Sequence, residues 1–333
     1  MEQINAIQKA IFQQIKEKLQ PNVSFVHEIA DLLDLSYDSA YRRIRGDKEL
    51  SFVELYKLST HYRISIDALC NIDSNNIIFN CQSLESKKFQ VKEWLQAILN
   101  DLKRIHAAKE KEIIYAAKDP PFFHHFQFPE IAAFKIFFWE KTLFQFPEYE
   151  EKKFRLDEAE PEIYNIGKQV LGIITKIPTV EIWNQDSFNI MLRQIEFYWI
   201  SGFFEKKDDL LNLIDKVEKW MLHIQKQAEM GFKFIYGEAV EGIENSYQFY
   251  ENEVVLNDNT VLTRIDDLIV VYLTFNVLSL LVTTNQQFCK TVHQHLKGLM
   301  MKSNLISMVS AKERSRFFNR LLANIDEFKN RVG

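Results

Sequence analysis

A basic cluster near the N-terminus carries the side chains best suited to bind another molecule. Arg42, Arg43 and Arg45 fall within four positions, and Lys48 follows them. Arginine binds a guanine edge or a phosphate through two parallel hydrogen bonds, whereas lysine binds phosphate as a point charge. A small polar segment leads into the cluster and a glycine closes it, as at the two ends of a short helix. The pattern predicts a helix over residues 37–45 that either reads DNA or forms a charged, solvent-exposed surface.

Helical spacing decides which of these side chains face outward. When Ala40 and Ile44 face inward, steps of about 100° per residue turn four others outward. These four are Asp38, Ser39, Arg42 and Arg45. We expect Arg42 to bind guanine with two hydrogen bonds, Ser39 to bond a base or a phosphate, and Asp38 to accept from cytosine or to exclude other bases.

The remaining residues of the predicted interface have positioning roles. Tyr37 lies at the N-terminal tip of the helix, the end that usually enters the groove. We expect Arg43, Arg45 and Lys48 to contact phosphates, which set the register of a protein on DNA but not its sequence preference. The local charge opposes binding, because residues 24–70 hold six Lys/Arg against eight Asp/Glu, a net of −2. We therefore expect weak binding by one copy, and a homodimer that spans two half-sites.

Short helices must position this surface. Apolar residues at helical spacing over residues 1–20, followed by Pro21, predict the first helix. Four more helices begin at candidate N-caps, which are Ser24, Ser36, Ser51 with Glu54 as a capping box, and Ser65. Five short helices predict one domain over residues 1–70, with the plan of a helix-turn-helix.

Many positions of residues 28–69 match one family. The segment EIADLLDLSYDSAYRRIRGDKELSFVELYKLSTHYRISIDAL resembles the lambda-repressor/Cro-like, XRE-type helix-turn-helix family of bacterial regulators. The matching positions are Ala30 at the helix crossing, Leu35-Ser36 at the turn, Ile44 and Gly46 at the end of the third helix, Leu50-Ser51 and Glu54-Leu55 at the start of the fourth, and ISIDAL in the last. The resemblance implies a sequence-specific transcriptional regulator that binds double-stranded DNA as a dimer, with helix 37–45 in the major groove.

Two departures limit what the resemblance transfers. The family often has glycine in the turn, where this chain has Asp34, a residue that tolerates left-handed backbone better than most. The phage repressors often begin helices two and three with glutamine, where this chain has Ser24-Phe25 and Tyr37. No base preference is therefore transferred, and the operator and the direction of regulation stay open.

Residues 84–333 are expected to form a larger, mainly helical region after a linker over 71–83. Apolar residues in a long helix over 84–112 step by four and three, which fits either packing on the chain's own core or a short dimer seam. Further helices are predicted over 160–176, 180–204, 206–230, 285–301 and from Ser310. Asn- and Asp-rich turns predict short strands near 247–274. The expected fold class is mainly α, with a small antiparallel sheet.

Aromatic residues gather in two segments of this region, 122–128 and 134–139. They could line an apolar ligand pocket, but aromatic residues at helical spacing are typical of a core, and core packing is the interpretation we favour. A small-molecule effector has no other support in the sequence. The stretches FQFPEIAAFKIFFW and VSAKERSRFFNRL resemble the tails of uncharacterised bacterial regulators, which implies no activity.

Composition narrows the class of protein. Hydrophobic residues make up 47% of the 333, enough for a buried core, and 9 Gly and 7 Pro favour helices over a turn-rich sandwich. The net charge of −5 gives no whole-chain basic signal for nucleic acid. Three cysteines far apart favour a reducing, cytoplasmic compartment. The most apolar run, 268–282, is too short to span a membrane.

Two other patterns approach catalytic or metal motifs without completing them. His27-Glu28 is followed by Asp31, where a zinc-protease helix has its second histidine. His124-His125 lies in a proline- and phenylalanine-rich loop, where adjacent histidines without a carboxylate or cysteine partner are more often packing or surface groups than metal ligands. We therefore predict no enzyme, no metal site and no cofactor. The alternative to DNA binding is a protein-interaction module that keeps the helix-turn-helix fold.

Overall fold

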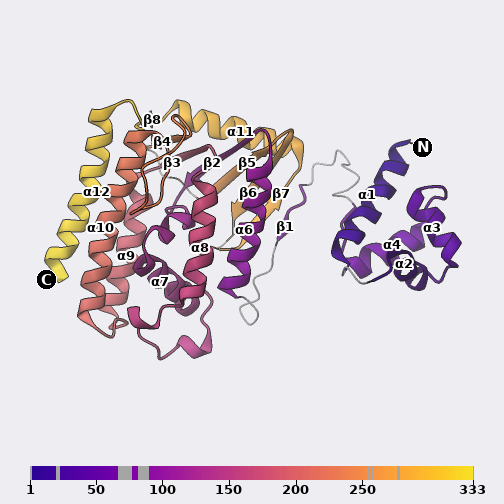
Figure 1. Ribbon diagram of the computed structural model, residues 1–333, viewed down its shortest axis with the longest axis horizontal. Coiled ribbons are helices and arrows are strands. Elements are labelled where there is room, and N and C mark those ends of the chain that lie inside the picture. Colours follow the sequence, from indigo (N-terminus) through magenta and orange to yellow (C-terminus); the bar gives the residue numbers. More distant parts are fainter. Residues whose placement is uncertain are drawn as a thin grey trace. The chain divides into compact units, whose positions relative to one another are not determined.

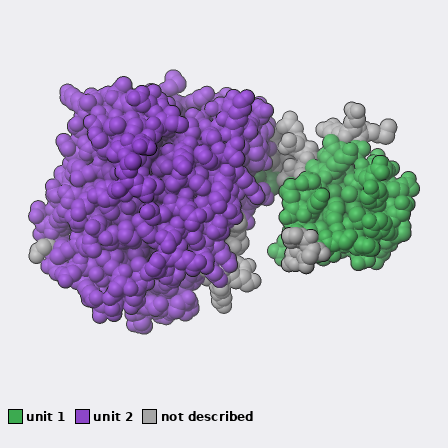
Figure 2. Space-filling view, viewed as in Figure 1, with its two compact units in different colours: residues 1–78 green, residues 79–333 purple. Residues whose placement is uncertain are grey.

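Two separate hydrophobic cores divide the chain into an N-terminal unit, residues 1–78, and a C-terminal unit, residues 79–333 (Figure 2). The computed structural model describes residues 2–19, 23–66, 77–81, 90–253, 256, 258–275 and 278–332. The expected fifth helix and most of the expected linker lie outside these residues. Within the expected linker, Asn80–Cys81 form strand β1 of the C-terminal unit.

The N-terminal unit consists of short helices whose ends are set by local residues. They are α1 (Glu2–Lys18), α2 (Phe25–Leu33), α3 (Tyr37–Arg45) and α4 (Phe52–Tyr62) (Figure 1). The Ser36 hydroxyl accepts from the Ser39 amide, as predicted. Ser51 and Glu54 form both hydrogen bonds of the predicted capping box. Ser24 occupies the N-cap position of α2, as predicted, but its side chain makes no cap hydrogen bond to a described residue.

Left-handed residues end both helices of the turn region. Asp34 follows α2 with φ 56° and ψ 49°, the conformation that we expected it to tolerate. Gly46 ends α3 at φ 83°, where a residue without Cβ is least strained. Ala30 on α2 and Ala40 on α3 are buried in the core of the unit, and their small side chains let the two helices approach each other.

Within the described residues, eight strands of the C-terminal unit form one mixed sheet. They are β1, β2 (Lys111–Ala117), β3 (Thr179–Trp183), β4 (Tyr247–Glu251), β5 (Thr260–Ile265), β6 (Leu268–Thr274), β7 (Leu280–Thr283) and β8 (Asn304–Leu305), in the order β1-β7-β6-β5-β2-β3-β4-β8. The pairs β2–β3 and β3–β4 are parallel, and the others are antiparallel. The predicted fold class, mainly α with a small antiparallel sheet, is therefore wrong.

The missed strands β2 and β3 explain this error. All five positions of β3 and the last five of β2 are buried, so neither strand shows the alternation of a half-buried strand. The predicted helices over 84–112 and 180–204 overlapped these strands. The observed helices are shorter, α6 (Val91–Ala107) and α9 (Gln185–Ile200). Strands that are buried on both faces read as apolar runs, which pattern alone does not separate from buried helices.

Helices cover both faces of the sheet. Besides α6 and α9, the described helices of this unit are η1 (Phe122–Gln127), α7 (Pro129–Phe138), η2 (Trp139–Leu143), η3 (Pro147–Tyr149), η4 (Leu156–Glu158), α8 (Pro161–Ile174), α10 (Lys207–Met230), α11 (Gln286–Met301) and α12 (Ala311–Val332). One face packs on α11 through Ile114, Ile182 and Leu262, which meet Cys289 and Leu296. The other face joins the main core, where α6 lies beside α8 and α10 beside α12 (Figure 1).

The apolar seam of α6 packs inside the C-terminal unit. Val91, Leu95, Leu102 and Ile105 are all buried in the main core. Of the two interpretations that the spacing allowed, the structure therefore places this seam in the chain's own core. A face that is used in this way is not free to pair with a second copy.

Candidate functional site

Helix α3 is fixed to the rest of the N-terminal unit by one buried glutamine. Gln8 Nε2 on α1 donates to the carbonyls of Arg43 (2.7 Å) and Lys48 (2.8 Å), and Gln8 Oε1 accepts from the Leu50 amide (3.0 Å). A buried amide is stable only when its donors and acceptor are paired, as they are here. These bonds hold the end of α3 and the loop to α4 against α1, and so set which face of α3 points outward.

The outward face of α3 carries several of the residues predicted to contact DNA. The side chains of Asp38, Arg42 and Arg45 are exposed, and so is Lys48 just beyond the helix. Among the described residues, Arg42 has no carboxylate within 4 Å, the limit for an ion pair. The Arg45 Nε lies 3.4 Å from a carboxylate oxygen of Asp47, in an exposed pair that contributes little. Of the three clustered arginines, Arg42 is therefore the one most available to a ligand.

Two tyrosines frame this face. Tyr37 at the N-terminal tip is 52% exposed, and its ring lies 5.0 Å from the ring of His27. Tyr41 is 43% exposed, and the Arg45 guanidinium carbon lies 5.7 Å from the centre of its ring. Tyr41 was not among the predicted contact residues, although its spacing of four from both Tyr37 and Arg45 places it on the same stripe. It adds an apolar contact surface beside the arginines.

Two of the predicted contact residues are engaged inside the unit instead. Ser39 is partly buried, and its hydroxyl accepts from the Ser36 hydroxyl at 2.9 Å. Arg43 is buried, with one terminal nitrogen 2.7 Å from Glu54 and another donating to the Ser39 carbonyl at 3.1 Å. Burial raises the pKa of Glu54, but the hydrogen bonds from Arg43 and from the Ser51 amide, together with the charge of Arg43, outweigh it, and the pKa lies below its ordinary value. Arg43 thus joins α3 to α4 and does not face a phosphate.

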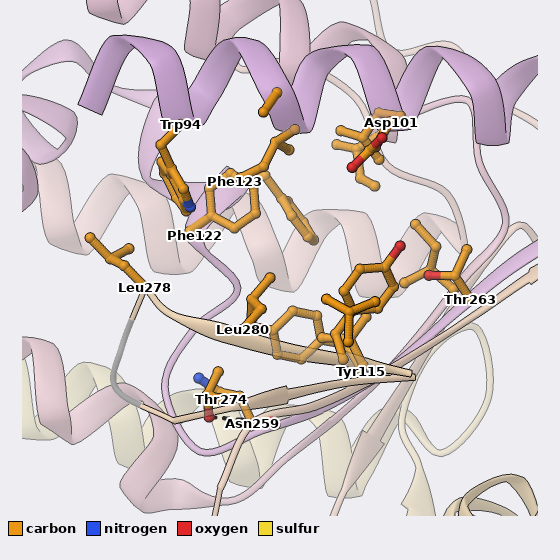
Figure 3. Close-up of a pocket in the computed structure, with 18 of the residues that line it drawn as sticks. Trp94, Asp101, Tyr115, Phe122, Phe123, Asn259, Thr263, Thr274, Leu278 and Leu280 are labelled. Atoms are coloured by element: carbon orange, nitrogen blue, oxygen red, sulfur yellow. Dashed lines mark hydrogen bonds between the residues drawn. The ribbon is translucent and has the colours of Figure 1, made fainter. Parts of the chain in front are cut away.

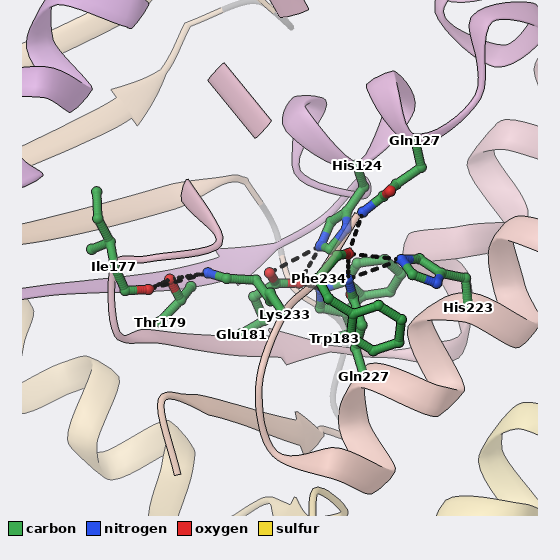
Figure 4. A network of polar contacts seen from close by, with 10 residues as sticks. All are labelled: His124, Gln127, Ile177, Thr179, Glu181, Trp183, His223, Gln227, Lys233 and Phe234. Atoms are coloured by element: carbon green, nitrogen blue, oxygen red, sulfur yellow. Dashed lines mark hydrogen bonds and ion pairs between the residues drawn. The ribbon is translucent and has the colours of Figure 1, made fainter. Parts of the chain in front are cut away.

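A second buried polar group organises the C-terminal unit. The Glu181 side chain on β3 has no exposed surface. Its carboxylate accepts from the Trp183 indole at 2.9 Å, and both of its oxygens lie 3.0 Å from Nε2 of His124 on η1 (Figure 4). A buried carboxylate is tolerated only where its oxygens are hydrogen-bonded. This contact therefore fixes η1 against the sheet.

A buried lysine lies in the same layer of the unit. Lys233 donates to the Ile177 carbonyl at 3.4 Å and to the Thr179 hydroxyl (Figure 4). Burial lowers the pKa of Lys233 to about 7, and the charge of Glu181 acts in the opposite direction. Lys233 and Glu181 thus each have their own hydrogen-bond partners inside the core, and we assign both a structural role.

A cavity of about 390 Å³ lies between α6 and one face of the sheet (Figure 3). This size falls within the range of small-molecule sites, roughly 300–1,000 Å³. Trp94 and Asp101 line it from α6, and Tyr115 and Thr263 line it from strands β2 and β5. Most of the other lining side chains are apolar. The C-terminal unit therefore holds a second candidate site.

The aromatic segments that we interpreted as core serve two purposes. Phe126 and Phe134 are buried in the main core, as expected. Phe122, Phe123 and Trp139 also border the cavity. The interpretation as core alone was incomplete, because no local spacing shows that α6 and the sheet leave a gap beside these rings.

Comparison of the chain with protein-family models, with curated proteins and with solved structures finds no match. No helix in the described part of the chain combines the length and the apolar character needed to cross a membrane. Across the same residues, no group of three or more His, Cys, Asp or Glu side chains is arranged to hold a metal ion.

Replacing Arg43 with alanine is expected to loosen α3 and α4, because Glu54 loses its partner. Arg42→Ala removes an exposed guanidinium from the same helix and is expected to leave both helices unchanged. Amide hydrogen exchange over residues 37–62 of the intact chain, followed by mass spectrometry, measures this difference. Equal exchange in the two variants would contradict the structural role of Arg43.

Acid is expected to have the same effect as Arg43→Ala. The folded pKa of Glu54 lies below its unfolded value of about 4.3, so its contribution to stability is present above that pH. The contribution is lost as the pH falls through the folded pKa. The protection factors of the α3 and α4 amides in wild type, which take account of the slower intrinsic exchange in acid, should therefore fall below about pH 4.3, whereas those of Arg43→Ala should change less.

Glu181→Ala is expected to destabilise the C-terminal unit by about 3–5 kcal/mol, because His124 and Trp183 lose a buried partner. All 5 tryptophans lie in this unit, so urea unfolding followed by their fluorescence reports on it alone. Glu205→Ala, which removes an exposed carboxylate 4.0 Å from Lys153, is the control and should leave the midpoint unchanged. Midpoints that fall equally in both variants would show that the buried contact does not determine stability.

Proposed function

We propose that the chain is a bacterial, cytoplasmic transcriptional regulator that binds double-stranded DNA through α3. The observation that supports this most is the outward face of α3, which carries Arg42 and Arg45 behind the tip residue Tyr37 and is not used in packing. The tight turn between α2 and α3 and the resemblance to XRE-type domains agree with it. The proposal includes no enzymatic activity and no cofactor.

In this proposal α3 lies in the major groove, with its N-terminal end foremost. Arg42 binds guanine through two hydrogen bonds, and Asp38 accepts from cytosine or excludes other bases. Arg45 and Lys48 each neutralise one phosphate. Each neutralised phosphate contributes about −0.9 to the slope of the logarithm of the binding constant against the logarithm of the salt concentration. The expected slope is therefore about −2 for one copy and about −4 for two. Arg43 and Ser39 support the helix rather than the DNA.

A homodimer is part of the proposal. Two phosphate contacts on a domain segment with a net charge of −2 over residues 24–70 give one copy little affinity. Two copies of α3 placed about 34–36 Å apart read two half-sites one helical turn apart. We propose that the larger C-terminal unit provides the dimer contact.

Arg42→Lys is expected to weaken binding to a selected duplex about 10- to 100-fold, because lysine keeps the charge but loses the two-bond contact to guanine. Binding to random duplex should change little. The duplex is first selected from a randomised library with the full chain. Affinities are then measured by fluorescence anisotropy between about 50 mM and 200 mM salt, the range in which phosphate contacts are resolved.

Lys16→Ala is the matched control, because it removes one exposed positive charge from α1 of the same unit. It should leave both affinities unchanged. If Arg42→Lys behaved like this control, α3 would not be in the groove. If Arg42→Lys weakened random and selected duplexes equally, Arg42 would contact phosphate rather than a base.

A protein-interaction module is the second candidate, and the surface of α4 favours it. Phe52, Val53 and Tyr56 are 80%, 63% and 63% exposed, which places three apolar side chains together on one helix. The two candidates differ in the low-salt titration. The regulator binds random duplex at about 50 mM salt, where phosphate contacts are strongest, whereas an interaction module that lacks DNA binding does not.

A further inference from the structure

The cavity of the C-terminal unit has one wall made by alternate residues of four neighbouring strands. Tyr115 on β2 pairs with Val261 on β5, which pairs with Tyr272 on β6, which pairs with Val282 on β7. All four line the cavity, and side chains on one face of a sheet alternate along each strand. The opposite face packs on α11, and the cavity lies on the face that joins the main core.

One end of the cavity is apolar. Trp94 on α6 and Phe122 on η1 meet edge to face with ring centres 5.1 Å apart, and Phe123 follows at 5.8 Å from Phe122. Leu278 and Leu280 complete this end (Figure 3). Walls of this kind favour the hydrocarbon part of a ligand, because binding there removes the ligand's apolar surface from water and a hydrocarbon needs no hydrogen bonds from the protein.

The other end presents hydroxyl groups that lack partners. Tyr115 and Thr263 are 8% and 2% exposed, and neither hydroxyl bonds to any other described residue. Tyr272 lies close by and is likewise unbonded within the described ranges, with its pKa raised to about 12 by burial and by the charge of Asp101. Asp101 on α6 faces Tyr115 and Thr263 across the cavity (Figure 3). All three side chains line the cavity, so their hydroxyls are free to bond to a ligand there.

Two of the charged groups around the cavity have polar partners in the protein. The Asp101 carboxylate lies 3.7 Å from the guanidinium of Arg104. The Lys135 side chain is buried and donates to the Gln194 side chain at 2.8 Å. Burial lowers the pKa of Lys135 to about 8, and the negative charge of Asp119 acts in the opposite direction. A ligand with its own charge would leave that charge unpaired, so a neutral polar head fits better than an acid or an amine.

We propose that this cavity binds a neutral apolar alcohol, whose hydrocarbon body lies at the Trp94–Phe122 end and whose hydroxyl bonds to Asp101, Thr263 and Tyr272. An alcohol suits this end because it donates one hydrogen bond to the carboxylate and accepts others from the protein hydroxyls. A volume of about 390 Å³ equals about 13 water molecules at ~30 Å³ each, which sets the ligand at roughly a dozen non-hydrogen atoms. The proposal does not depend on DNA binding.

Isothermal titration of the full chain with decan-1-ol, decanoate and decylamine tests this assignment. Decan-1-ol should bind most tightly. Tyr272→Phe and Thr263→Val remove single hydroxyls without changing shape, and each should weaken decan-1-ol about 3- to 10-fold, the usual effect of one hydrogen bond. Tyr236→Phe removes an exposed hydroxyl outside the cavity and should have no effect. Val261→Phe fills the centre of the strand wall and should abolish binding.

Four results would overturn the proposal. Decan-1-ol that gives no heat would show that the cavity takes no such ligand, and tighter binding of decanoate or decylamine would show that the head is charged. If decan-1-ol bound the Val261→Phe variant as tightly as wild type, its site would lie outside the cavity. An effect of Tyr272→Phe no larger than that of Tyr236→Phe would exclude the hydroxyl end. The two single-hydroxyl variants decide the matter even if Val261→Phe does not fold.

Discussion

The carboxylate of Glu181 is the constraint on which the C-terminal unit depends. A charged group with no exposed surface is stable only when its oxygens are hydrogen-bonded, and here the partners are Trp183 on the same strand and His124 on η1. In the sequence η1 lies between β2 and α7. The contact therefore joins the segment that follows β2 to β3, the strand beside β2 in the sheet. It thereby holds Phe122 and Phe123, which precede His124 on η1, where they line the cavity (Figure 3). The buried Glu181–His124 contact in this way positions the apolar wall of the cavity.

The N-terminal unit uses the same device on a smaller scale. Gln8 binds the backbone at the end of α3, and the Arg43–Glu54 pair joins α3 to α4. Together these contacts prevent α3 from turning about its own axis, so that Arg42 and Arg45 stay outward. Of the three clustered arginines, one therefore builds the unit and two remain for a partner. The cluster is neither wholly a binding surface nor wholly a solvated face.

Local signals in the sequence predicted the N-terminal helices because each is delimited by residues that act within a few positions, as Ser36 and Gly46 do. The sheet was not predictable in this way, because β2 and β3 are buried on both faces and carry no alternation. The site residues divide similarly. A helical wheel found Arg42, but the partners of Arg43 and His124 lie on other elements, in the second case 57 residues away. The cavity follows from the spacing of α6 over the sheet, which no local pattern reports.

The claim that α3 binds DNA is central to this account, and a crystal structure of the chain with its selected duplex tests it most directly. The account predicts α3 in the major groove, with Arg42 bonded to O6 and N7 of a guanine and with Arg43 still paired to Glu54. A complex in which α3 faces solvent, or in which Arg43 leaves Glu54 to contact the DNA, would contradict it.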